Sequence, residues 1–133
     1  MSDLEGMYQG YKDIAEFRIV YISEAHATDD RRPVPYAIEK KISEHTTYGE
    51  RCSVAGRLLT DEKLTIPTLI DKMDNGVAET YDAHPNRVYV ITSDGVIGAR
   101  APSSGPTGWQ PGLKAAKEWL TEYRATGKES ILP

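Results

Sequence analysis

The segment Phe17–Ile22, which reads FRIVYI, constrains the fold of this chain more than any other part of its sequence. Apart from Arg18, every side chain in it is aromatic or β-branched, and such residues favour β-strands. A short apolar run of this kind is typical of a strand in the core of a sheet. We therefore predict a buried strand over residues 17–23.

An acid and a base, Glu24 and His26, follow the predicted strand. Side chains two positions apart in an extended chain point to the same face, so the two groups are expected to face the same way. Open α/β sheets hold their ligands and reacting groups at the carboxyl ends of their strands. The pattern fits a functional pair, and it also fits two solvated polar residues at the end of a strand.

The rest of the chain predicts helices and strands in alternation. Helical spacing and turn signals predict helices over residues 3–14, 48–60, 77–83 and 111–125. Strands are expected over 65–72 and, as a hairpin about Asp94-Gly95, over 87–92 and 96–100. This α/β order matches a thioredoxin-like three-layer sandwich with a mixed central sheet, in which the first central strand is missing.

Length and composition limit the class of protein. With 133 residues, 39% hydrophobic and 27% charged, the chain is expected to form a single globular domain. A net charge of −4 and the lack of a Lys/Arg stripe argue against nucleic-acid binding. No apolar run is long enough to cross a membrane and the N-terminal residues do not resemble a signal peptide, so we expect a cytoplasmic protein without a membrane partner.

The single cysteine, Cys52, excludes an internal disulfide and a Cys-x-x-Cys pair within these residues. It lies in the helix predicted over residues 48–60, where Cys52, Ala55, Leu58 and Leu59 would form the apolar face. We interpret it as a small core residue rather than a reactive thiol.

Five sequence blocks, in order, resemble the iodothyronine deiodinases and their bacterial deiodinase-like relatives. They cover nearly the whole chain, and the first, which contains Glu-Ala-His, is specific in combination with the third and fourth. The blocks are FRIVYISEAHATD at 17–29; His45 with Glu50-Arg51; LIDKMDN at 69–75; Tyr81 with PNRVYVI at 85–91; and Gly105-Pro106 with the helix that carries Trp119-Leu120.

The resemblance implies a reductive dehalogenase of thyroxine 5′-deiodinase type, with a halogenated aromatic or other thiol-reducible small molecule as substrate. Family members attack iodine with a selenocysteine or cysteine and are regenerated by an external thiol, with no bound cofactor or metal. By position, Tyr21, Glu24 and His26 would carry protons and His45 would assist.

Two further residues, Arg100 and Trp109, are the candidates for substrate binding. The family's Arg before Gly-Pro, which clamps the substrate carboxylate, is Ser104 here, and Arg100 is the nearest arginine in sequence. Trp109 follows Gly105-Pro106 and either lines a pocket or covers the predicted hairpin.

The chain departs from the family pattern at its nucleophile. The family's selenocysteine motif lies upstream of the helix with which these residues begin, and Cys52 does not replace it. We therefore expect an inactive selenoprotein fragment, started at Met1 because a selenocysteine codon was read as a stop. Its unpaired sheet region would make the protein marginally stable or pair it with a second copy.

Three other classes of protein remain as alternatives. The first is a non-catalytic binding or regulatory module of thioredoxin-like fold. The second is a metal site of Glu24, His26 and His45, whose spacing fits no common zinc pattern. The third is a Ser-His-Asp hydrolase, which the absence of a Gly-x-Ser-x-Gly segment disfavours.

Overall fold

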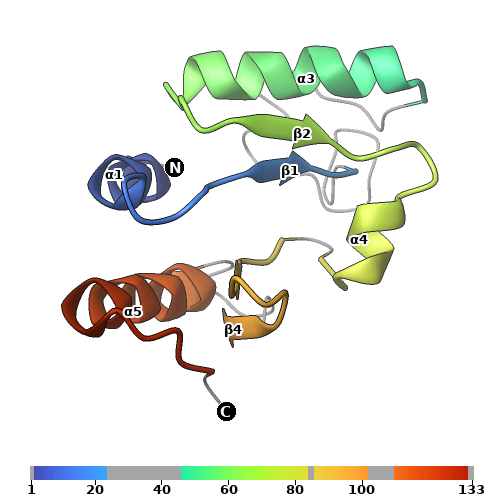
Figure 1. The fold of residues 1–133 in the computed structure, drawn as a ribbon. Coiled ribbons are helices and arrows are strands. Elements are labelled where there is room, and N and C mark those ends of the chain that lie inside the picture. The colour runs from blue at the N-terminus through green and yellow to red at the C-terminus, as the bar shows by residue number, and fades with distance from the viewer. Residues whose placement is uncertain (1, 24–45, 84–85, 102–109, 132–133) are drawn as a thin grey trace. The chain divides into compact units, whose positions relative to one another are not determined.

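The computed structural model describes residues 2–23, 46–83, 86–101 and 110–131. Within these ranges the protein is an α/β structure of helices and two small sheets (Figure 1). Contacts between residues group the chain into two compact units. The first unit comprises Met1–Glu5 and Phe17–Pro85, and the second comprises Gly6–Glu16 and Asn86–Pro133.

The first unit contains a parallel pair of strands with a helix packed on it. β1 (Ile19–Tyr21) pairs with β2 (Thr68–Ile70), with Tyr21 opposite Ile70. α3 (Tyr48–Asp61) packs against β2, and the short α4 (Gly76–Thr80) follows it in the chain (Figure 1). Parallel strands end at the same edge of a sheet, so residues that follow Tyr21 and Ile70 leave from one edge.

The start of α3 is fixed by its sequence. Thr47 is the N-cap, and its hydroxyl accepts a hydrogen bond from the Glu50 amide at 3.1 Å. The Glu50 carboxylate accepts in return from the amide and hydroxyl of Thr46, both at 3.0 Å. This reciprocal arrangement resembles a capping box and explains why the helix predicted from residue 48 begins there.

The buried face of α3 differs from the predicted one. Ala55 is buried, whereas Cys52, Leu58 and Leu59 are only half-buried. Arg51, which the apolar pattern did not include, is 1% exposed and is the largest fully buried side chain among the described residues.

The second unit is a hairpin with a helix on it. β3 (Tyr89–Ile91) pairs antiparallel with β4 (Ile97–Arg100), and the predicted turn contains Gly95 at a φ of 80°, a conformation that favours glycine. α5 (Gln110–Thr126) packs on both strands, and its buried residues include Leu113, Ala116, Trp119 and Leu120.

The residues after α5 are held against the same unit. The Glu129 carboxylate accepts hydrogen bonds from the Ser93 amide at 3.0 Å and the Ser93 hydroxyl at 2.5 Å. The Trp119 indole donates to the Ser130 carbonyl at 2.7 Å. Polar contacts therefore bind residues 129 and 130 to the hairpin and to α5.

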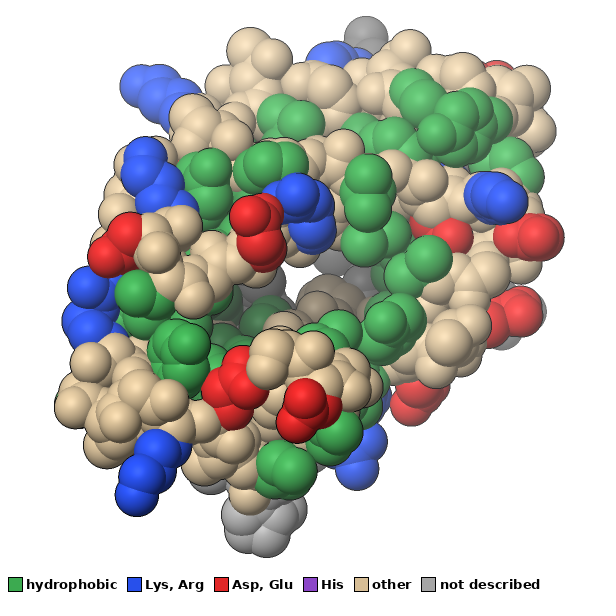
Figure 2. All heavy atoms as spheres, viewed as in Figure 1, with side chains coloured by type: hydrophobic (Ala, Val, Ile, Leu, Met, Phe, Trp, Pro, Cys, Tyr) green, Lys and Arg blue, Asp and Glu red, His purple; other side chains and the backbone are tan. Residues whose placement is uncertain are grey.

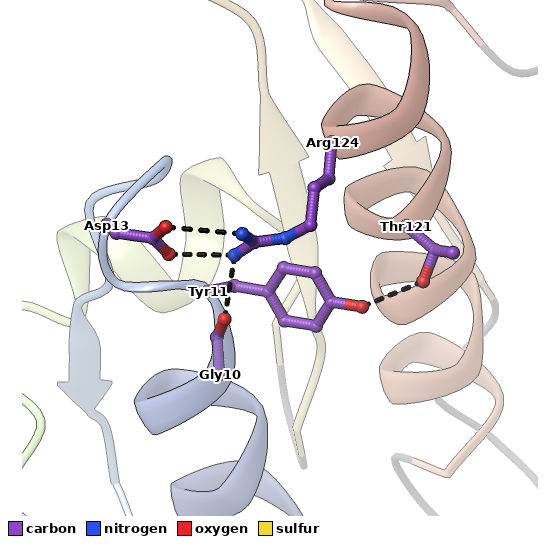
Figure 3. A network of polar contacts seen from close by, with 5 residues as sticks. All are labelled: Gly10, Tyr11, Asp13, Thr121 and Arg124. Atoms are coloured by element: carbon purple, nitrogen blue, oxygen red, sulfur yellow. Dashed lines mark hydrogen bonds and ion pairs between the residues drawn. The ribbon is translucent and has the colours of Figure 1, made fainter.

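The last turn of α1 (Ser2–Tyr11) and the residues after it also bind α5 (Figure 3). The Arg124 guanidinium donates a hydrogen bond to the Gly10 carbonyl at 2.8 Å and forms an ion pair with the Asp13 carboxylate at 2.7 Å. The hydroxyls of Tyr11 and Thr121 are hydrogen-bonded at 2.9 Å. The hydrogen bond from Arg124 lowers the pKa of the Asp13 carboxyl from its ordinary value.

The α/β class and the order of the elements are confirmed, and the strands are shorter than predicted. The thioredoxin-like arrangement and the single domain stay predictions, because both concern how the two units combine.

On the face seen in Figure 2, Lys and Arg side chains are interspersed with acidic and hydrophobic ones.

Candidate functional site

The carboxyl end of the β1–β2 pair is the part of the candidate site that the structure describes. Tyr21 is the last residue of β1 and is 9% exposed. Its carbonyl accepts a hydrogen bond from the Asp71 amide at 2.9 Å, one residue beyond the end of β2. Tyr21, the first residue of the predicted proton relay in sequence, therefore lies at a buried strand end that is hydrogen-bonded to Asp71.

Several other predicted site residues lie outside the described residues. These are Glu24, His26, His45 and Trp109. The proposed pairing of Glu24 with His26, and the alternative metal site that adds His45, therefore stay predictions. Among the residues that are described, no group of three or more His, Cys, Asp or Glu side chains could hold a metal ion.

Asp71 joins the strand end to the helix that follows. Its carboxylate is 2% exposed and accepts hydrogen bonds from the amides of Lys72 at 2.9 Å, Val77 at 3.0 Å and Ala78 at 2.9 Å. Asn75 occupies the N-cap position of α4 but makes no capping bond with its side chain. Asp71 therefore serves as the cap from outside the helix, and the amides satisfy its buried charge.

Arg51 binds the same segment from α3. Its Nη1 donates to the carbonyls of Asp71 at 3.1 Å and Lys72 at 2.9 Å, and its Nη2 donates to Asn75 Oδ1 at 3.2 Å. Asn75 has a φ of 59°, so the turn that it forms is sharp. One buried guanidinium thus holds three acceptors within the five residues that follow β2.

The structure also describes Arg100, a predicted substrate-binding residue, and the single cysteine. Arg100 is the last residue of β4 in the second unit, where it is exposed and pairs with Tyr89 in the strand register. Cys52 is half-buried on α3 and free of any disulfide. Its hydrogen bond with Tyr48, one turn earlier, raises the pKa of that phenol above its ordinary value. Within the described ranges, no helix has the length and apolar character that a membrane crossing requires.

Comparison with known proteins decides the family. A family model described as iodothyronine deiodinase matches residues 1–124. The chain belongs to the iodothyronine deiodinase family. It is 33% identical over 118 residues to a thyroxine 5-deiodinase of Sparus aurata, a match that covers 86% of this chain and 40% of that protein. It is 29% identical over 113 residues to a type I iodothyronine deiodinase of Xenopus laevis, covering 84% of this chain and 42% of the relative.

A thyroxine 5-deiodinase of Gallus gallus is 32% identical over 118 residues, covering 86% of this chain and 42% of that protein. The chain therefore spans about two fifths of the length of these curated deiodinases. The resemblance drawn from the five sequence blocks is confirmed at the level of the family.

Two of the blocks that identify the deiodinase family meet in the structure. Arg51 ends the second block, and Asp71 and Asn75 belong to the third. The hydrogen bonds of Arg51 join them, although nothing in their separate spacing predicts contact. Sequence reasoning assigned Arg51 no role, and the available signal was its place four residues before the buried Ala55, on the same face of a helix.

Proposed function

We propose that this chain is the proton-handling part of a deiodinase-type thiol or selenol oxidoreductase that reductively removes halogen from an aromatic substrate. The family match over residues 1–124 carries the proposal. The geometry supports it, because the block that contains Glu24 and His26 leaves a buried strand end held by Asp71. Relatives named thyroxine 5-deiodinase favour an iodinated aromatic compound as the substrate.

The reaction requires one proton and two reducing equivalents for each halogen. A selenolate or thiolate bonds to iodine as the carbon–iodine bond breaks, and the electron pair remains on the aromatic carbon. That carbon takes a proton, which we assign to His26 oriented by Glu24, with Tyr21 and His45 completing the relay. A histidine whose pKa lies near neutrality suits this task. Two external thiols then reduce the selenium–iodine bond, which forms a disulfide, restores the selenolate and releases iodide and two protons. One of these protons returns to His26.

The proposed nucleophile is a selenocysteine or cysteine outside these 133 residues, since Cys52 lies within α3. On its own, the chain is proposed to be inactive. The complete protein is proposed to have a thioredoxin-like sheet with one further, central strand beside β1. That strand would present the nucleophile near the carboxyl end of β1.

The test restores the missing part. The chain is extended at its N-terminus by a strand that carries selenocysteine or cysteine, and iodide release from thyroxine and from simpler iodophenols is measured with dithiothreitol. Thiol-dependent release is expected, while a matched extension with serine and the unextended chain release none. Replacement of His26 by Asn should lower kcat by about 10²- to 10⁴-fold, the usual contribution of a general acid. A folded selenocysteine protein that binds these compounds without releasing iodide would instead support the non-catalytic module.

A further inference from the structure

Arg51 occupies a position where packing alone would favour an apolar side chain. It is 1% exposed, and it lies on the face of α3 that also buries Ala55. Burial of a guanidinium is unfavourable unless its donors are satisfied by well-placed acceptors. Its acceptors here include two main-chain carbonyls and one side-chain amide, in the fork geometry that arginine provides and lysine does not.

The bonds of Arg51 reach β1 through a single residue. The carbonyl of Asp71 accepts from Arg51, and the amide of Asp71 donates to the Tyr21 carbonyl. The two peptide groups of Asp71 therefore link α3 to the last residue of β1. The carboxylate of the same residue binds α4, so a shift of Asp71 is resisted from three sides.

We propose that Arg51 is a positioning residue for the dehalogenation reaction. By fixing Asp71, Lys72 and Asn75, its guanidinium sets the place at which the chain leaves β1, and hence the place of the proton-transfer residues that follow. Arg51 acts through the backbone and does not itself transfer a proton. This inference rests on the proposed function for its catalytic consequence, whereas the mechanical link from Arg51 to Tyr21 can be tested without activity.

The primary test is amide hydrogen exchange on the 133-residue chain. Arg51→Lys keeps the charge, but the compact ammonium cannot match the three-acceptor fork, so the Asp71 amide should exchange about tenfold faster. Amides of α5 should be unchanged, which separates a local effect from global unfolding. Arg57→Lys is the matched control, because Arg57 is exposed on the same helix. Asn75→Gly removes one acceptor of Arg51 and tolerates the positive φ, so the Asp71 amide should exchange faster, but by a smaller factor. It provides the test if Arg51→Lys does not fold.

The second test is kinetic and uses the extended protein that carries the nucleophile. Arg51→Lys should lower kcat by about 10- to 100-fold, as expected for a small displacement of reacting groups, and leave KM within about twofold. Unchanged exchange at Asp71 overturns the inference, and so does faster exchange with unchanged kcat. If the extended parent protein shows no dehalogenation, the proposed function fails, and the exchange data alone then decide whether Arg51 holds the end of β1.

Discussion

Replacement of Asp71 by Ala tests whether one carboxylate holds the turn between β2 and α4. The side chain is 2% exposed and accepts three amide hydrogen bonds, of which the one from Ala78 is buried and those from Lys72 and Val77 are part-buried. An unsatisfied buried donor costs about 1–3 kcal/mol, and part-buried donors recover some of this from water. We therefore expect Asp71→Ala to lower the free energy of unfolding by about 2–4 kcal/mol.

The measurement is urea unfolding followed by far-ultraviolet circular dichroism, with amide exchange reporting on α4 itself. Asp71→Asn should lower the free energy of unfolding by less, since its one side-chain oxygen can accept two of the three hydrogen bonds. Its side-chain NH2 group would face the third backbone amide, and two donors cannot form a hydrogen bond. Asp74→Asn is the control, because Asp74 is exposed and caps only the Gly76 amide at 3.1 Å. A loss below about 1 kcal/mol for Asp71→Ala, or equal losses at positions 71 and 74, would refute the reasoning.

Three further outcomes follow from the structure. Gly98→Ala should lower the urea midpoint, because its new methyl group would lie 2.9 Å from the Trp119 indole nitrogen, and the cost of such overpacking is about 1–3 kcal/mol. Gly56→Ala, exposed on α3 with no atom within 4 Å of the new methyl, should raise the free energy of unfolding by about 0.5–1 kcal/mol. The Ser93 hydrogen bonds lower the pKa of the Glu129 carboxyl, so its stabilising effect is present above the ordinary value of 4.5 and is lost as the pH falls through the lowered pKa.

The acid titration is followed by tryptophan fluorescence, since Trp119 contacts the residue next to Glu129. Ser93→Ala should reduce this part of the pH dependence, because it removes the hydroxyl hydrogen bond and keeps the one from the amide. An identical acid transition in the parent and the Ser93→Ala protein would rule out a contribution of the Ser93 hydroxyl. A urea midpoint equal to that of the parent would contradict the packing argument for Gly98→Ala and the helix-propensity argument for Gly56→Ala.

The sequence predicted the existence and order of the helices and strands but not the length of the strands. The apolar run from Phe17 predicted seven positions of strand, and the structure pairs Ile19–Tyr21 only. The carbonyl of Pro67 accepts from the Ile19 amide, but proline has no amide hydrogen to donate, so the regular ladder stops there. The length of a paired strand depends on both strands of the pair, whereas an apolar run in the sequence gives information on one strand alone.

For the candidate site, the sequence predicted the motif but not the contacts around it. The Glu-Ala-His block identified the family because motifs preserve residue identity and order, which sequence displays directly. The role of Arg51 was missed because a charged residue in an amphipathic helix is ordinarily assigned to the solvent side. Its acceptors lie 20 to 24 positions further along the chain, and only tertiary structure brings them together.

The contacts of Arg51 also determine which positions can be substituted in the segment that follows β2, residues 71–75. Among its acceptors are two main-chain carbonyls, those of Asp71 and Lys72, which every residue type supplies. The side chains of Lys72 and Met73 are exposed and take no part in these bonds. Substitutions at 72 and 73 can therefore change the size and charge of the surface beside the carboxyl end of β1 while the turn keeps its shape. Members of one family could diversify in specificity at these positions without altering the backbone that carries their chemistry.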